Sequence, residues 1–334
     1  MPNFLLFLVS SILALTLGCL IIDVSHYFLR RDPFTFISFD SYLGWSPIPN
    51  LSLPDRPSGS IHTNSKGFRS EEIDPKRSQI LIAGDSVAWG YGLPDNQTLS
   101  FYLQNKLKNE QVQNLAVPGY GLDQSYLRLK SDIGQIPYVQ HVILVLFAND
   151  LEDIATNTLY GKRKPLFRFD GTNLKLTGVP VQRFNIRNLL AESWLYKRFV
   201  EPSPVLANLF SKMAGDKKIS IKEASDICEI LLEQLVAFLK EKGADLTVVL
   251  SPSRNEFSDR SEAYKWFENF LSDHKINFID GATLIARKYP GDQRTLYWDG
   301  AHYSASGNAL LAEIIFDALF RETNNQPESG KELR

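Results

Sequence analysis

The stretch LIAGDSVAWG, residues 81–90, is an apolar run that ends on Gly-Asp-Ser just before an aromatic-rich turn. A short, continuous apolar run bounded by glycine is typical of a strand buried in a parallel sheet. In an open α/β sheet, ligands bind beyond the carboxyl ends of the strands. Ser86 therefore stands where chemistry is expected, although Ser after Asp is also an ordinary helix-capping pair.

Similar apolar runs recur on both sides of this stretch and alternate with helical periodicity. The expected strands are QILIAG (79–84), VQNLAV (112–117), HVILVLF (141–147), LTVVLS (246–251) and INFID (276–280). The clearest expected helices are Thr98–Asn109, Ile221–Lys242, Ser258–Ser272 and Ser304–Phe320. Short apolar strands separated by helices predict a doubly wound α/β sandwich with five parallel strands.

Composition sets the class of protein. The chain has 334 residues, 44% of them hydrophobic and 22% charged, with a net charge of -2. These values describe one main globular domain, and no charge excess favours nucleic acid as a partner. The two cysteines, Cys19 and Cys228, offer no disulfide within a soluble domain because Cys19 lies in the N-terminal apolar run.

The N-terminus predicts a membrane segment. From Phe4 to Ile22 the chain is apolar or small and carries no charge, which is long enough to cross a bilayer core of about 30 Å. A retained anchor is favoured over a cleaved signal peptide because MPN holds no basic residue, and a lipoprotein at Cys19 is a third option. Arg30 and Arg31 after the segment favour a cytoplasmic C-terminal side.

The expected organisation has four parts. A transmembrane anchor covers 1–22, an extension or linker packed partly on the domain covers 23–77, the main domain covers 78–322, and a polar tail at 323–334 is expected to be disordered. An insertion at 157–220 interrupts the main domain. It contains LFRFDGTNLKLTG, which reads as a hairpin around Asp170-Gly171, and NIRNLLAESWLYKRFV, which has one apolar helical face. Loops of this length cover a site, bind a partner or form a packed satellite.

Further polar residues follow the ends of the other strands. Gly119 in NLAVPGYG can bring its backbone N–H close to a ligand, and Asn149 in FAND offers an amide donor. Asp299 and His302 in YWDGAH precede the last helix. A serine hydroxyl needs a base, so His302 is the expected base for Ser86 and Asp299 the group that fixes its tautomer. The N–H groups of Ser86 and Gly119 with the Asn149 side chain form the expected oxyanion hole.

These blocks, in this order, resemble those of the SGNH or GDSL hydrolases. The matching stretches are GDSV (84–87), NLAVPGYG, the Asn-Asp of FAND, and DGAH (299–302), and the likeness spans 78–320. It is strongest to a bacterial membrane-anchored branch that shares a TNSKGFRS-like stretch (63–70). The resemblance implies a flavodoxin-like three-layer α/β/α sandwich, no cofactor, and ester hydrolysis or acyl transfer. It implies a catalytic triad of Ser86, His302 and Asp299, with Ser86, Gly119 and Asn149 in the oxyanion hole.

Two positions depart from that pattern, since Phe147 replaces the usual glycine of the third block and Val87 the leucine of the first. An Asp-x-x-His spacing also occurs at Asp23 and His26, but only the second pair follows the last strand. His62, His141 and His274 lack a second ligand at metal spacing, so no metal is expected. The glycine motifs lack the third glycine of a nucleotide-binding fingerprint.

Aromatic and basic residues near these blocks have structural interpretations. We expect Trp89 and Tyr91 to pack at the pocket mouth, and Trp45, Asn64 and Arg69 to tie the N-terminal extension to the domain. The favoured function is a single-pass membrane esterase that acts on small acyl esters, such as acetyl groups on carbohydrate. Members of the resembled family with such an anchor usually work outside the cytoplasmic membrane, so we expect the domain on the extracytoplasmic side despite Arg30 and Arg31. An O-acyltransferase that modifies a glycan or lipid and a non-catalytic membrane-tethered binding module are the alternatives. Substrate-binding residues are not identified.

Overall fold

A computed structural model describes residues 35–54, 59–160, 162–182, 196–200, 202–207, 209 and 217–321, and also seven positions between 7 and 21. Within these ranges, no helix has the length and apolar character needed to span a membrane. Most of the predicted anchor at 1–22, most of the apolar helix predicted at 185–200, and the tail at 323–334 lie outside the described residues.

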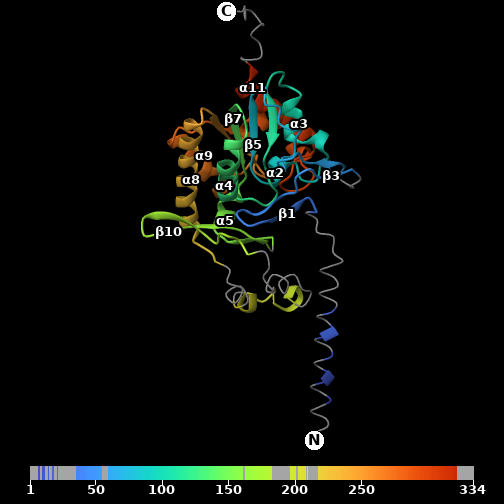
Figure 1. Cartoon of the computed structure of the whole chain (residues 1–334), viewed down its shortest axis with the longest axis vertical. Helices are drawn as coiled ribbons and strands as arrows, with labels where there is room; N and C mark the ends of the chain where they lie inside the picture. Colours follow the sequence, from blue (N-terminus) through green and yellow to red (C-terminus); the bar gives the residue numbers. More distant parts are fainter. Residues whose placement is uncertain are drawn as a thin grey trace, which may run out of the picture.

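A five-stranded parallel sheet forms the centre of the molecule (Figure 1). Its spatial order is β13, β12, β7, β5, β6, which is the order 2-1-3-4-5 of a flavodoxin-like sheet. The strands are β5 (Gln79–Ala83), β6 (Gln111–Asn114), β7 (Val139–Leu146), β12 (Asp245–Leu250) and β13 (Phe278–Asp280). All five expected strands are therefore present, and the predicted parallel α/β sheet is confirmed.

Helices cover both faces of this sheet and bury two separate apolar cores (Figure 1). Strand β7 shows why, because Val142, Leu144 and Leu146 face one core while Ile143 and Val145 face the other. The first core is covered by α4 (Leu122–Asp132), α5 (Asp150–Ile154), α8 (Ile221–Glu241) and α9 (Glu262–Asp273). The second is covered by α2 (Ser86–Trp89), α3 (Leu99–Gln104), α10 (Gly281–Lys288) and α11 (Ala305–Leu319).

Serine caps start three of the longer helices. The side chains of Ser220, Ser261 and Ser304 accept hydrogen bonds from the backbone N–H three residues on, which satisfies a donor that the helix itself leaves unpaired. The four expected helices are present as α3, α8, α9 and α11, and α3 is shorter than the apolar pattern suggested. Short 3₁₀ turns lie at Asp95–Gln97, Ile133–Gln135 and Gln293–Leu296.

The N-terminal extension packs on the domain as two hairpins. They are formed by β1 (Ile37–Asp40) with β2 (Gly44–Pro47), and by β3 (Ser52–Leu53) with β4 (Ile61–His62). Trp45 of β2 is buried, and its Nε1 donates to the carbonyl of Pro118 at 3.0 Å. Gln124 on α4 donates to the carbonyl of Leu43 at 2.8 Å. The extension is therefore fastened to the loop after β6.

The insertion begins with two hairpins beyond the carboxyl edge of the sheet (Figure 1). They comprise β8 (Thr158–Leu159) with β9 (Lys162–Arg163), and β10 (Leu166–Asp170) with β11 (Asn173–Thr177). The second is the hairpin predicted around Asp170-Gly171, and Gly171 takes the left-handed conformation at φ 64°. Within the described part of the remainder, Tyr196–Val200 forms a π-helical turn.

Candidate active site

Ser86 lies where the chain turns from strand β5 into helix α2. Gly84 has φ +142°, and a Cβ there would stand 2.5 Å from the carbonyl oxygen of Val145, so the turn requires glycine. Asp85 caps α2, because its Oδ1 accepts the N–H of Val87 at 2.8 Å. Glycine and aspartate thus bend the chain, and they leave Ser86 half-buried as the first residue of α2.

Three side chains from two distant parts of the sequence form a hydrogen-bonded line. Ser86 Oγ and His302 Nε2 lie 2.8 Å apart, and His302 Nδ1 lies 2.7 Å from Asp299 Oδ2. Asp299 Oδ1 accepts the backbone N–H groups of Ala301 at 2.8 Å and His302 at 2.7 Å. Every predicted member of the triad is therefore in contact with its predicted partner.

The electrostatics of Asp299 suit an ionised partner for an imidazole. Partial burial alone would raise its pKa, but hydrogen bonds from the backbone and ring of His302 and from Ala301 outweigh burial and hold the pKa below its usual range. Asp299 is consequently a carboxylate at neutral pH, and as a carboxylate it only accepts hydrogen bonds. The proton between Asp299 and His302 therefore resides on His302 Nδ1, which leaves Nε2 free to accept from Ser86.

Two aromatic side chains pack beside His302. Trp298 stacks on the imidazole with ring centroids 5.5 Å apart, and Tyr91 lies 5.2 Å from it. Trp298 Nε1 donates to the carbonyl of Tyr91 at 3.2 Å, and the Trp298 side chain is 47% exposed. Tyr91 is near the site as expected, whereas Trp298 was not singled out from the sequence. Trp89 is not at a mouth, because it is fully buried and stacks on Phe36.

Gly119 lies in the loop after β6, which is next to β5 in the sheet. Its φ is +80°, and a Cβ there would stand 2.9 Å from the ring of Tyr160, an exposed residue between β8 and β9. Tyr120, the next residue, donates to the backbone carbonyl of Trp45. The insertion and the extension therefore both contact the glycine loop. Only a glycine fits without strain between Tyr160 and this backbone.

Asn149 follows strand β7, which flanks β5 on the other side. The three loops that carry Ser86, Gly119 and Asn149 therefore leave the carboxyl ends of adjacent strands. Asn149 occupies the N-cap position of α5 without a side-chain capping bond, and its Nδ2 donates to Asp153 Oδ2 at 2.8 Å. At the position where the resembled family has glycine, Phe147 packs against the second core, and its N–H donates to Asp150. The contacts of Asn149 to the other predicted donors stay a prediction.

Several carboxyl groups are buried beneath these loops. Burial raises the pKa of Asp85, and together with the charge of Asp85 it raises the pKa of Asp150 well above its usual value. Burial also raises the pKa of Asp153 to about 7. Lys164 of the insertion is a fully buried cation paired with the equally buried Asp123. Among these buried groups, four are carboxyl groups and one is a cation.

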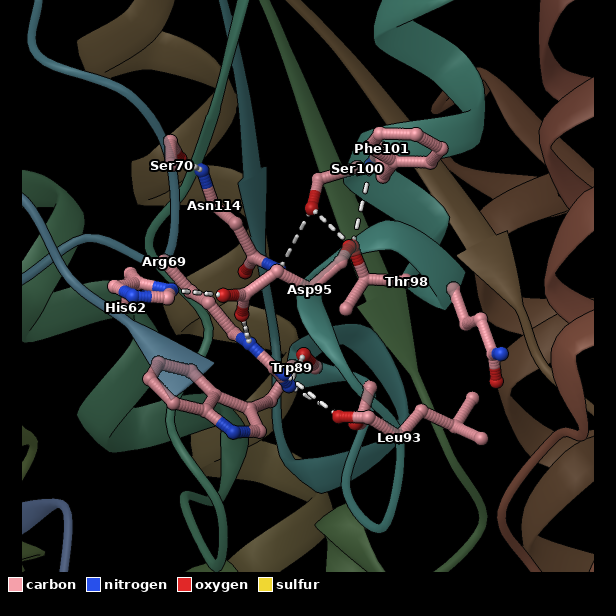
Figure 2. A network of polar contacts seen from close by, with 12 residues as sticks. His62, Arg69, Ser70, Trp89, Leu93, Asp95, Thr98, Ser100, Phe101 and Asn114 are labelled. Carbon is pink, nitrogen blue, oxygen red and sulfur yellow. Dashed lines mark hydrogen bonds and ion pairs between the residues drawn. The ribbon is translucent and has the colours of Figure 1, made fainter. Parts of the chain in front are cut away.

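Figure 2 shows a network of polar contacts around Arg69. The network holds the turn at residues 89–93, which includes Tyr91. Arg69 donates from Nε to Asp95 Oδ1 at 2.8 Å, and Asp95 Oδ2 lies 2.7 Å from His62 Nδ1. The rest of its guanidinium donates to the carbonyls of Trp89, Gly90 and Leu93. Asn64 donates to Gln113 Oε1 of β6 at 3.2 Å. Arg69, Asn64 and Trp45 therefore tie the extension to the domain, as predicted.

The remaining histidines have other partners. His141 bonds to Thr247 Oγ1 at 3.0 Å, His274 contacts the carbonyl of Phe270, and His26 lies outside the described residues. Within the part of the chain that the structure describes, no group of three or more His, Cys, Asp or Glu side chains is arranged to hold a metal ion.

No protein-family model matches this sequence, and no curated protein sequence matches it. Several solved structures are similar to it. A member of the lipolytic protein G-D-S-L family from Veillonella parvula is 13% identical, with a TM-score of 0.43, and the match covers 73% of this chain and 99% of that one. The psychrotrophic esterase EstA from Pseudoalteromonas sp. is 15% identical, with a TM-score of 0.42 and coverages of 74% and 100%. A lipase/acylhydrolase from Enterococcus faecalis is 15% identical, with a TM-score of 0.42 and coverages of 76% and 100%.

Proposed function

We propose that this chain is a serine esterase of the SGNH or GDSL type that hydrolyses small acyl esters through an acyl-enzyme. The observation that carries the proposal is the continuous line from Ser86 Oγ through His302 to Asp299, with distances of 2.8 and 2.7 Å. A nucleophile, a base and a group that orients the base are what acyl transfer from an ester requires. The ordered sequence blocks at 84–87 and 299–302 give independent support.

The chemistry follows from these positions. His302 Nε2 takes the Ser86 hydroxyl proton as Oγ attacks the ester carbonyl carbon, and the carbonyl oxygen becomes an oxyanion. The N–H groups of Ser86 and Gly119 and the Asn149 amide are the proposed donors to that oxyanion, each worth about 3 to 4 kcal/mol when well aimed. Collapse breaks the bond to the alcohol, which leaves with the proton from His302. Water, deprotonated by His302, then attacks the acyl-enzyme, and Ser86 regains its proton as the acid is released.

The surroundings of the site favour a small acyl group and a carbohydrate alcohol. Tyr160 packs against Gly119, which restricts the space beside the proposed oxyanion hole. Trp298 and Tyr91 give the histidine side an aromatic wall that includes the half-exposed indole of Trp298. Exposed aromatic rings suit the apolar faces of sugar rings, since such rings bury large areas with few rotatable bonds. We therefore favour an O-acetyl group on a glycan as the substrate.

An O-acyltransferase is the second candidate because the insertion reaches the site. Tyr160 belongs to residues 157–220, and its contact with Gly119 places this segment at the glycine loop. A covered site excludes water and can hold an alcohol acceptor, which would then attack the acyl-enzyme in place of water. A binding module that keeps the fold without catalysis would not require the hydrogen-bonded arrangement of Ser86, His302 and Asp299.

The membrane anchor and the location remain part of the proposal. The uncharged apolar run at 4–22 would tether the domain, and we place the domain on the extracytoplasmic side, where glycan esters are accessible. A reporter enzyme fused after Arg334 tests this placement. Reporter activity confined to the cytoplasm would contradict it.

The direct test of the function uses the full-length chain in detergent and a fluorophosphonate probe, with the labelled peptide mapped by mass spectrometry. We expect labelling at Ser86 that is lost in Ser86→Ala and in His302→Ala. His274→Ala is the matched control. His274 contacts the carbonyl of Phe270 on α9 and not Ser86, so its replacement should leave labelling intact. Absence of labelling in a folded chain would contradict the proposed serine chemistry. Hydrolysis and transfer are then separated by adding a glycan acceptor and measuring the acylated product.

A further inference from the structure

The side chain of Asp153 lies one helical turn after Asn149 on α5 and bonds directly to it. Asn149 Nδ2 donates to Asp153 Oδ2 at 2.8 Å. Asp153 is only 7% exposed. Residues four apart on a helix lie one above the other, so α5 itself sets this pairing. The contact involves the same amide nitrogen that the proposed oxyanion hole needs.

Asp153 also contacts the glycine loop on its other side. A Cβ on Gly121, two residues after Gly119, would stand 3.1 Å from the Cβ of Asp153. Asp153 is thus packed between the two loops that carry the proposed oxyanion donors. The charge of Lys164, which is itself buried and paired with Asp123, offsets only part of the effect of burial on Asp153. A carboxyl group in this position costs solvation energy, so the site retains a group that burial disfavours.

The charge of Asp153 decides how the Asn149 amide is turned. A carboxylate only accepts hydrogen bonds, so it holds the NH₂ end of the amide toward itself through one N–H. The second N–H on that nitrogen is then left for another acceptor. Within the described residues, Asn149 Oδ1 is buried and has no hydrogen-bond partner. Nothing at the oxygen end competes with Asp153 for control of the amide.

We infer that Asp153 is a positioning residue that aims the Asn149 amide at the oxyanion, and that it does so only when ionised. The inference rests on the proposed function, because it assigns Asp153 a role through Asn149 in the same acyl transfer. A protonated Asp153 can donate to an amide oxygen, which gives the Asn149 oxygen a partner once the amide turns over. In that orientation the Asn149 NH₂ group points away from the proposed oxyanion position, and the oxyanion loses a donor.

The surroundings place this change of charge near neutral pH. Burial raises the pKa of Asp153 to about 7, and the charge of Lys164 opposes this increase. The other charged or titratable groups that act on Asp153 or respond to it are Asp85 at the start of α2, Asp123 on α4, Asp150 and Glu152 on α5, and Tyr160 between β8 and β9. The carboxylates all favour the protonated form of Asp153.

A double-mutant cycle tests whether Asp153 acts through Asn149. The kcat for hydrolysis of p-nitrophenyl acetate is measured for the full-length chain and for Asn149→Ala, Asp153→Ala and the double variant. We expect Asn149→Ala to lower kcat by about 10²- to 10³-fold, as for the loss of one oxyanion donor. Asp153→Ala should lower kcat by about tenfold or more in the native background and by less than about twofold in the Asn149→Ala background, because coupled residues are not additive.

A second variant keeps the test informative if Asp153→Ala fails to fold. Asp153→Asn retains an oxygen that can accept from Asn149 but has no proton to titrate. Between pH 6 and 8, kcat should therefore vary less with pH in this variant than in the native chain. Glu262→Ala, which removes an exposed carboxylate from the first turn of α9, is the matched control and should leave kcat unchanged. Equal losses from Asp153→Ala in both backgrounds, or an unchanged pH profile in Asp153→Asn, would overturn the inference.

The proposed function can fail separately from this inference. Full turnover by Ser86→Ala would refute the serine mechanism itself. Loss of turnover in Ser86→Ala combined with normal turnover in Asn149→Ala would leave the nucleophile in place and overturn the role assigned to Asp153.

Discussion

Replacement of Asp299 by asparagine should reverse the tautomer of His302. In the structure, Oδ1 of Asp299 accepts two backbone N–H groups at 2.8 and 2.7 Å, and Oδ2 accepts His302 Nδ1 at 2.7 Å. Asparagine has one oxygen, and the two backbone donors retain it. Its NH₂ group then faces Nδ1, which must become an acceptor, so the ring proton moves to Nε2. An Nε2–H cannot remove the proton of Ser86.

The size of the loss follows from which interactions remain. The proposed oxyanion donors and the hydroxyl of Ser86 are untouched, so residual catalysis should persist. The base function is lost except in the minor tautomer, and in a serine hydrolase with the same three groups this change lowers kcat by about 10⁴-fold. That factor corresponds to about 5 kcal/mol of transition-state stabilisation. Folding should be little affected, because both backbone hydrogen bonds survive.

The assay compares kcat for p-nitrophenyl acetate between pH 5 and 10 in the native chain and in Asp299→Asn. Urea unfolding of both proteins monitors the fold. Asp292→Asn is the matched control, since Asp292 is an exposed carboxylate that caps a 3₁₀ turn just before this loop and is bonded to Arg294. We expect full activity from that control.

Activity of Asp299→Asn within about tenfold of the native value would refute the reasoning. It would mean that His302 keeps its base function without the carboxylate, and that the observed line of hydrogen bonds is structural. Partial recovery at high pH would instead support it, because a higher hydroxide concentration can replace the missing base.

Three further predictions concern the surroundings of the site. Gly119→Ala should lower kcat at least about tenfold, because its φ of +80° and the Tyr160 ring 2.9 Å from the new Cβ force the loop to move, and Tyr160→Ala should partly restore kcat in the double variant. Arg69→Met should lower the free energy of unfolding in urea by about 2 to 4 kcal/mol, at about 1 kcal/mol per lost hydrogen bond, because three backbone carbonyls lose this donor and Asp95 retains His62 but loses Arg69. A loss below about 0.5 kcal/mol would contradict this. The folded pKa of Asp153 lies above its ordinary value, so its contribution to stability is present below about pH 4 and is lost as the pH rises through 7, a change of roughly 4 kcal/mol. Between pH 5 and 8, the free energy of unfolding in urea should therefore fall less in Asp153→Asn than in the native chain. Equal decreases in the two proteins would contradict the raised pKa of Asp153.

The sheet could be predicted from the sequence because its strands are buried on both faces. Such strands read as uninterrupted apolar runs, and β5, β7 and β12 match their predicted runs closely. The run at 112–117 continues three residues beyond the end of β6 because its last residues belong to the loop that packs against the extension. Apolar runs report burial, and burial does not end where the strand ends.

Helix α4 was not among the predicted helices because its burial hides its periodicity. Every residue from Leu122 to Leu129 is buried, including the polar Asp123, Gln124 and Arg128. Amphipathic periodicity requires one face in water. The polar side chains of α4 instead contact other buried groups, such as Lys164 and the carbonyl of Leu43, and these partners are distant in sequence.

The hydrogen-bonded arrangement of Ser86, His302 and Asp299 and the nearby Tyr91 were accessible to sequence reasoning, but Trp298 and Tyr160 were not. Ser86 and His302 each follow a recognisable strand or precede a recognisable helix, and their chemistry demands a partner. Trp298 and Tyr160 have no such signal, because the sequence alone does not distinguish an aromatic residue at the site from one buried in the core. Trp89 shows the opposite error, since it lies next to the active-site turn in sequence and is buried in the core. Asp153 had a usable signal, its i,i+4 spacing from Asn149 on a helix too short to be recognised.

The hydrogen bond from Trp45 to the carbonyl of Pro118 spans 73 positions of the chain. The loop that presents Gly119 is therefore completed by a segment made much earlier during synthesis, and it cannot reach its final shape until the two meet. In a random deletion screen, small losses within residues 43–47 should cluster with active-site lesions, although none of these residues contributes to the triad. A fragment designed for crystallisation should accordingly start ahead of Phe36, even though the alternation of strands and helices first becomes visible at Ser78.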